Sequence, residues 1–202
     1  HQRSTVLGYS ELMESRVDVP CQICSSEGTV SMMSHSSEIP YFGEHTQITM
    51  VCSGCGWKNT DFIPSDGEKP GYCSLTLDDV EKLSSRVVRS SSCTIRIPQL
   101  DLEVSPGGSS SGYITNIEGV ITRFDEAIAS LCRSEDSEEL VIRALEIIGQ
   151  LNEVRNCTKI VDVELLDPMG RSQIIHEHAK SRDLSDEEFA SLDSGPNVPI
   201  ID

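Results

Sequence analysis

Two pairs of cysteines, each separated by two residues, constrain this chain more than any other feature of its sequence. The first pair is Cys21 and Cys24, and the second is Cys52 and Cys55. Two intervening residues let one tight turn present both sulfurs, and two such turns together supply the four thiolates of a tetrahedral zinc site. The sequence therefore predicts one structural zinc ion bound by Cys21, Cys24, Cys52 and Cys55.

The segment between the two pairs predicts a zinc ribbon over residues 21–66. It spans residues 25–51, a longer gap than the about 15–20 residues of the commonest template. A β-hairpin with strands at 29–33 and 47–51 accounts for this length, and 57–63 forms a third strand. The alternative is a pair of redox-active motifs, but neither pair opens a helix as such motifs do. Four thiolates leave no position for water, so we expect the zinc to stabilise the fold without taking part in catalysis.

Charge restricts the class of partner. The chain has 33 acidic against 16 basic residues, a formal net charge of -17. Phosphate backbones and anionic lipids repel such a surface, so we expect a protein partner, with no nucleic acid and no membrane. No run of about 18 apolar residues is present. Two C-x-x-C pairs are also unlike a secreted disulfide framework, which favours a reducing, cytoplasmic location. With no Gly-rich phosphate loop, nucleophile elbow or convincing acid pair in the sequence, we expect no enzymatic activity.

The rest of the chain predicts a mainly β domain that contains helices. A lead-in at 1–20, with a short helix near 11–16, precedes the ribbon, and a β domain follows at 67–182. Within it, we expect a short helix capped by Thr76 and a helical hairpin at about 115–155 that opens with a Thr115–Glu118 capping box. The apolar hairpin positions are Val120, Phe124, Ile128 and Leu131, then Leu140, Leu145, Ile148 and Leu151. Strands are expected at 87–88, 93–97, 100–104, 159–166 and 171–175. From Asp183 to Asp202 we expect an acidic mobile tail.

Two further groups of residues are candidate sites. Gly170 followed by His176-Glu177-His178 is similar to the first half of a cupin metal motif. A cupin-like metalloenzyme is therefore an alternative function, although Asp183 is the only further candidate ligand that follows. The alternative is exposed histidines beyond the last strand. Tyr41, Phe42 and Trp57 lie near the ribbon turns, where they either pack in the core or contact a partner.

Several segments in fixed order resemble the ZPR zinc-finger family. The match extends from about residue 20 to residue 180. The segments are Cys21-x-x-Cys24 with Gly28-Thr29, Glu38-Ile39-Pro40-Tyr41-Phe42, Cys52-Ser53-Gly54-Cys55-Gly56-Trp57-Lys58-Asn59-Thr60, Arg86-Val87-Val88-Arg89-Ser90, Arg96-Ile97-Pro98-Gln99-Leu100-Asp101-Leu102-Glu103, Thr115-Asn116-Ile117-Glu118-Gly119 and Asp167-Pro168-Met169-Gly170-Arg171-Ser172.

The resemblance implies a fold and a function. The fold is a zinc ribbon followed by a double-stranded β-helix, similar to a jelly roll, with an inserted helical hairpin. The function is binding of an elongation factor 1-alpha-like translational GTPase, whose folding family members assist. This chain has one module, as archaeal members have, and Gln99 replaces the family's usual glutamate. The other possibilities are a nucleic-acid-binding zinc ribbon and the cupin-like metalloenzyme.

Overall fold

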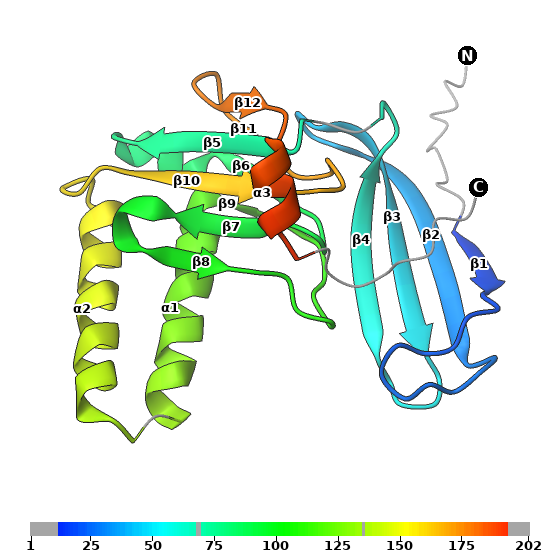
Figure 1. Cartoon of the computed structure of the whole chain (residues 1–202). Helices are drawn as coiled ribbons and strands as arrows, with labels where there is room; N and C mark the ends of the chain where they lie inside the picture. The colour runs from blue at the N-terminus through cyan, green and yellow to red at the C-terminus, as the bar shows by residue number, and fades with distance from the viewer. Residues whose placement is uncertain (1–11, 68–69, 135, 194–202) are drawn as a thin grey trace, which may run out of the picture. The chain divides into compact units, whose positions relative to one another are not determined.

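The described chain forms two compact units, one within residues 1–67 and the other within 68–202. A computed structural model describes residues 12–67, 70–134 and 136–193 (Figure 1). The expected class, mainly β with a helical hairpin, is confirmed. No helix in these ranges is long and apolar enough to cross a membrane.

The first unit is one antiparallel sheet with the strand order β1-β2-β3-β4. Its strands are β1 (Met13–Arg16), β2 (Val30–Ile39), β3 (Gly43–Cys52) and β4 (Lys58–Pro64). The expected hairpin is present, but β2 and β3 pair all the way from Val30 opposite Cys52 to Ile39 opposite Gly43. The short helix expected near 11–16 is wrong over its described part. Pairing with the edge of β2 gives that backbone hydrogen bonds that a one-turn helix could not supply.

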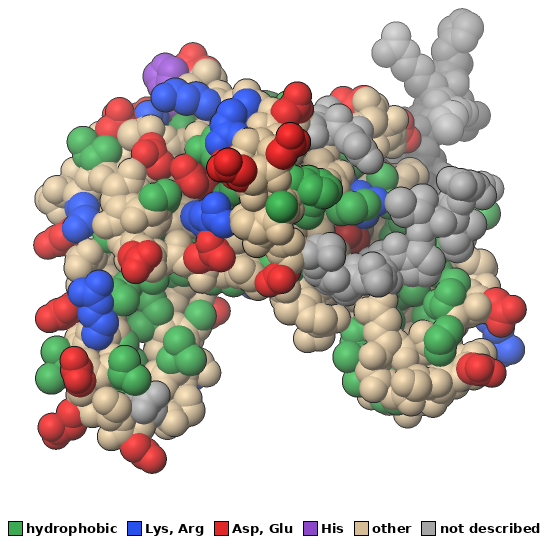
Figure 2. Space-filling model, viewed as in Figure 1, with side chains coloured by type: hydrophobic (Ala, Val, Ile, Leu, Met, Phe, Trp, Pro, Cys, Tyr) green, Lys and Arg blue, Asp and Glu red, His purple; other side chains and the backbone are tan. Residues whose placement is uncertain are grey.

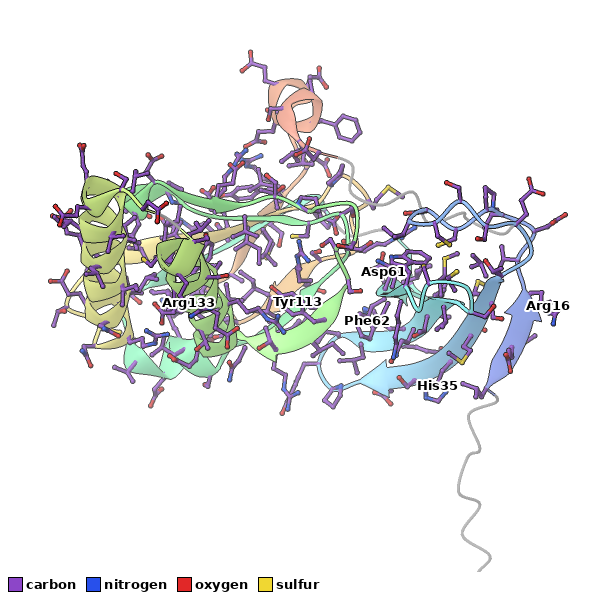
Figure 3. All side chains as sticks on the ribbon, turned by 90° about the horizontal axis from the view of Figure 1, so that it is seen from below. Arg16, His35, Asp61, Phe62, Tyr113 and Arg133 are labelled. Carbon is purple, nitrogen blue, oxygen red and sulfur yellow. The ribbon has the colours of Figure 1, made fainter. Side chains whose placement is uncertain are left out.

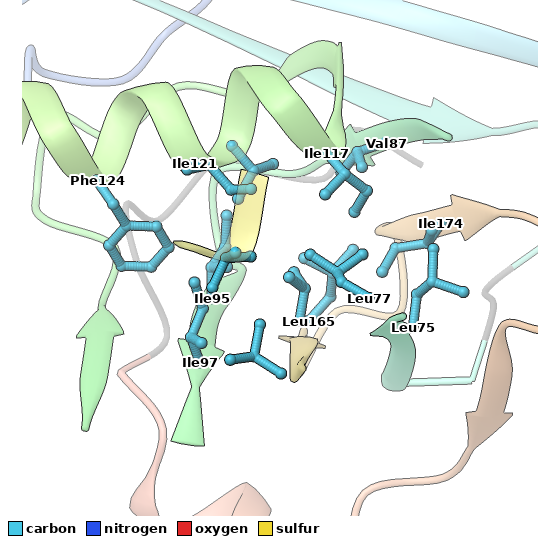
Figure 4. Close-up of a cluster of buried hydrophobic side chains, with 14 of the residues drawn as sticks. Leu75, Leu77, Val87, Ile95, Ile97, Ile117, Ile121, Phe124, Leu165 and Ile174 are labelled. Carbon is cyan, nitrogen blue, oxygen red and sulfur yellow. The ribbon is translucent and has the colours of Figure 1, made fainter. Parts of the chain in front are cut away.

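The second unit has two antiparallel sheets, with the orders β12-β5-β10-β7-β8 and β11-β6-β9. The strands are β5 (Tyr72–Leu77), β6 (Arg86–Arg89), β7 (Thr94–Ile97), β8 (Leu102–Val104), β9 (Tyr113–Asn116), β10 (Val161–Leu166), β11 (Gln173–Ile175) and β12 (Lys180–Arg182). The helices are the 3-10 turns η1 (Val80–Ser84) and η2 (Pro98–Leu100), and α1 (Ile117–Ser134), α2 (Glu138–Arg155) and α3 (Asp186–Ser191). Side chains of both sheets and of α1 meet in a single apolar core (Figure 4).

The helical hairpin of α1 and α2 packs on the core mainly through the half nearest the sheets. Phe124 on α1 and Leu151 on α2 are buried in the core, and Arg155 donates hydrogen bonds to Glu118 and Asp125, which ties the two helices together. The far half of the hairpin extends past the sheets (Figure 1). As a result, Leu131, Leu140 and Leu145, which the periodicity places on an apolar face, are exposed.

The caps of two helical segments differ from those expected. The capping residue of α1 is Asn116, whose Oδ1 accepts a hydrogen bond from the Gly119 amide at 2.8 Å. Thr115 instead pairs with Val87 within β9, and its hydroxyl fills the space beside Gly119, where an added Cβ would lie only 2.0 Å from Thr115 Oγ1. Thr76 lies in β5, and Asp79 caps η1 by accepting from the Glu81 amide.

One expectation for the C-terminal part also needs correction. The mobile tail expected from Asp183 contains the helix α3, which a Ser185–Glu188 capping box opens. Arg182 donates two 2.7 Å hydrogen bonds to Glu188 of α3, and its guanidinium lies over the ring of Tyr72 in β5. Arg182 therefore connects α3 to β5. Residues 194–202 of that predicted tail lie outside the described residues.

Gln99 has a structural role that a glutamate could not perform in this chain. Its amide nitrogen donates to Asp162 Oδ2 at 2.7 Å, while its carbonyl oxygen accepts from the Asp162 backbone amide at 3.0 Å. An ionised glutamate only accepts hydrogen bonds, so it would face the Asp162 carboxylate without a donor. Glutamine at position 99 therefore allows η2 to bond to Asp162 of β10, where glutamate would not.

Candidate metal centre

The two C-x-x-C turns bring their four sulfurs together in the first unit. The Sγ atoms of Cys21, Cys24, Cys52 and Cys55 all lie within 4.8 Å of one another. The two cross-turn pairs, Cys21 with Cys55 and Cys24 with Cys52, are each separated by 3.7 Å. Neighbouring sulfurs around one zinc ion are separated by this order of distance, given Zn–S bonds of about 2.3 Å and tetrahedral geometry.

Both turns have the same backbone design although only one has glycine. Gly56 takes a φ of +75° and donates its amide to the Cys52 carbonyl at 2.9 Å. In the first turn, Ser25 takes a φ of +57° and donates to the Cys21 carbonyl at 2.8 Å. A single non-glycine residue can adopt this left-handed conformation at a modest cost. The missing glycine after Cys24 therefore does not prevent a metal-binding turn.

Neutral donors surround the sulfurs. The Gly54 amide donates to Cys52 Sγ at 3.3 Å, and the Ile23 amide donates to Cys21 Sγ at 3.4 Å. The Thr29 hydroxyl lies 3.2 Å from Cys52 Sγ and, with backbone amides, lowers the pKa of the Cys52 thiol to about 6. Hydrogen bonds to an anionic sulfur favour its charged form. Thr29 is a contact of the centre that cysteine spacing alone does not reveal.

Ionisation of Cys55 is opposed by the sulfurs around it. The Trp57 amide lowers the pKa of Cys55, but burial and the three neighbouring sulfurs raise it, to about 12 overall. A further thiolate in the same cluster is repelled by the negative charge of the other thiolates, which raises its pKa. A divalent cation removes this repulsion, and soft sulfur donors in tetrahedral arrangement suit zinc. The cluster thus forms a single zinc site, as the spacing predicts.

Comparison with known proteins places the chain in a family. The family model described as the ZPR1 jelly-roll domain matches residues 81–193. An uncharacterised ZPR1-like protein of Pyrococcus horikoshii is 36% identical over 89% of this chain and 82% of its own length. The chain belongs to the ZPR1 family. The resemblance seen in the sequence is therefore confirmed.

Other ZPR1 relatives differ in length. A ZPR1-like protein of Methanocaldococcus jannaschii is 34% identical over 94% of this chain and 95% of its own length. The protein named zinc finger chaperone in Schizosaccharomyces pombe is 27% identical over 78% of this chain, which corresponds to 34% of that relative. The archaeal relatives therefore match this chain over most of their length, whereas the yeast relative is much longer than the matched part.

The cupin-like metal motif is not assembled. His176 Nδ1 accepts a hydrogen bond from the His178 backbone amide, and the two rings lie 5.3 Å apart. Within residues 12–67, 70–134 and 136–193, the four cysteines are the only cluster of three or more His, Cys, Asp or Glu side chains positioned to share an ion. The histidines therefore have no third ligand in the described part of this ZPR1 chain.

The three rings predicted near the ribbon turns separate into two environments. Phe42 and Trp57 are buried, at 4% and 8% exposure, so they are core residues of this structure and not surface anchors. Tyr41 is 78% exposed at the turn between β2 and β3, where it takes a φ of +73°. Sequence alone could not separate Tyr41 from Phe42, because neighbouring turn residues point in directions that only the turn geometry fixes.

Proposed function

We propose that this chain is a zinc-stabilised binding protein that assists the folding of an elongation factor 1-alpha-like GTPase, with Cys21, Cys24, Cys52 and Cys55 as zinc ligands. Two findings support a folding factor. A relative is named a zinc finger chaperone, and the second unit carries an exposed apolar surface. The zinc would hold the first unit together, because two of its ligands precede β2 and the other two lie at and just after the end of β3. With all four positions filled by sulfur, it would not activate water.

The observation that carries the proposal is the apolar surface of the helical hairpin. Leu131, Leu140, Ile142 and Leu145 are each between 54% and 66% exposed on the far half of α1 and α2. Figure 2 shows hydrophobic side chains on this part of the hairpin. Large apolar side chains grouped on a surface mark contacts with another protein. A partner that is not yet fully folded exposes apolar segments that such a surface can cover.

Charge supports a protein partner with a basic face. The net charge of -17 steers a cationic protein toward this chain and repels polyanions. Tyr41 is a second contact candidate, because an exposed aromatic ring adds contact area at a small entropic cost. We place the protein in the cytoplasm, where cysteines stay reduced and available to zinc.

A binding experiment with a matched control tests the proposal. The double variant Leu140→Ser, Leu145→Ser removes two exposed apolar side chains of α2, and Val80→Ser removes a similarly exposed one from η1. We expect the double variant to bind the GTPase at least about tenfold more weakly, roughly 1.4 kcal/mol, and to lose its effect on GTPase refolding yield. The Val80 variant should behave as wild type. A wild-type chain that neither binds the GTPase nor improves its refolding would refute the proposal.

A further inference from the structure

A cavity of about 320 Å³ opens in the second unit beside α1. Its wall contains side chains of β6 to β9, of α1 and of the loop after β8. Apolar contacts come from Ile95, Val104, Val120 and Phe124. The volume lies in the range of small-molecule sites, about 300–1,000 Å³. No acidic side chain lines this cavity in the described part of the chain, although the protein as a whole is strongly acidic.

Arg89 brings a buried positive charge to the cavity. The residue is only 5% exposed, and its Nε and Nη2 both donate to the Cys93 carbonyl, at 3.2 and 2.8 Å. Its Nη1 donates to Ser110 Oγ at 2.8 Å and to the Ser111 carbonyl at 3.2 Å. All of these acceptors are neutral oxygens. They hold the guanidinium in place but do not balance its charge, and a buried charge without a counter-charge is costly.

A second guanidinium and a phenol lie next to the first. The Arg123 guanidinium lies 3.8 Å from the centre of the Tyr113 ring, and that of Arg89 lies 5.5 Å from it (Figure 3 labels Tyr113). All three residues line the cavity. Burial raises the pKa of the Tyr113 hydroxyl, so at neutral pH it remains a hydrogen-bond donor. The cavity therefore combines two cations and a hydroxyl with an apolar wall.

We propose that this cavity binds a small monocarboxylate that carries an apolar body. The carboxylate lies between Arg89 and Arg123, and the hydrocarbon packs on Val120 and Phe124. Arg89 has already used all but one of its N–H groups on protein oxygens, so the site offers charge with few free donors. A carboxylate needs fewer donors than a phosphate, whose additional oxygens would be left without partners. The inference is independent of the proposed partner protein, since it concerns a cavity within the second unit.

Calorimetric titration at physiological salt with three probes tests the ligand chemistry. Octanoate has both the charge and the apolar body, 1-octanol lacks the charge, and inorganic phosphate lacks the apolar body. We expect octanoate to bind at one site in the millimolar range or tighter, as its size allows, and at least about tenfold more tightly than either other probe. Equal binding of octanol or phosphate, or no octanoate binding, would overturn the proposal.

A pair of arginine variants on the same helix locates the site. Arg123→Gln removes the exposed cation of the cavity, and Arg133→Gln removes an exposed cation from the last turn of α1. Ten residues of helix place them about 15 Å apart. Both variants change the net charge equally, and circular dichroism will show that both remain folded. Octanoate affinity should fall at least about fivefold in Arg123→Gln and stay unchanged in Arg133→Gln. Wild-type affinity in Arg123→Gln, or an equal loss in both variants, would contradict the site.

Discussion

Asp167 offers the sharpest test of how the second unit is held together. It is a buried carboxylate, 1% exposed, that follows β10. Its two oxygens accept hydrogen bonds from the hydroxyls of Ser90, Ser92 and Ser172 at 2.6 to 2.7 Å. They also accept from the backbone amides of residues 169 and 171, both at 2.9 Å. One side chain thus joins the turn after β10 to the segment between β6 and β7.

Asp167→Ala leaves five donors without their acceptor, and four of these hydrogen bonds are buried. Each stranded donor costs about 1–3 kcal/mol when it cannot find another partner. The hydroxyls recover part of this cost, because Ser90 Oγ and Ser92 Oγ lie 3.0 Å apart and can bond to each other. We therefore expect a loss of about 3–5 kcal/mol in the free energy of unfolding, which is large for a single substitution.

Urea unfolding followed by circular dichroism at 222 nm measures this loss, because the signal comes mainly from α1 and α2. Asp162→Ala is the matched control. It removes a carboxylate from strand β10, which precedes Asp167. The side-chain partners of Asp162, Thr76 and Gln99, are less buried, so we expect a loss below about 1 kcal/mol. Zinc content should be unchanged in both variants. A loss below about 1 kcal/mol for Asp167→Ala would refute the view that this carboxylate organises the turn.

Two further predictions concern the zinc centre and the C-terminal helix. The purified chain should contain about one zinc per molecule by metal analysis, and Cys52→Ser should lose it together with the slow amide exchange of β2–β4; retained zinc in that variant would contradict the ligand assignment. Hydrogen bonds from the Arg182 guanidinium lower the pKa of Glu188 to about 2. Because the folded pKa is depressed, the contact stabilises α3 fully above the usual pKa near 4.5 and is lost as pH falls through about 2. The pair is partly exposed, so we expect about 0.5 kcal/mol, seen as faster amide exchange of α3 at low pH that Glu188→Gln shows already at pH 7.

The zinc centre and the main helices were predictable from sequence because local pattern determines them. Two cysteines separated by two residues indicate a metal-binding turn, and the apolar period at 115–155 indicates two helices. The details around them depend on distant segments. Met13–Arg16 are a strand because β2 offers an edge, and Asn116 caps α1 from the end of β9, where its backbone pairs with Arg86. Propensity could not identify either outcome, since each is decided by hydrogen bonds to another part of the chain.

Burial is the property that the sequence left open. An apolar period says which hairpin side chains share a face, but only the packed structure shows that the sheets cover Phe124 and Leu151 and leave Leu131 and Leu145 exposed. The same holds for Arg89, whose sequence neighbours do not predict a buried cation in a cavity. The sequence by itself indicated the four-cysteine cluster, the family and the helical hairpin, because spacing and periodicity identify these features. The tertiary structure decided which surfaces remain for a partner or a ligand, because burial depends on what distant segments cover.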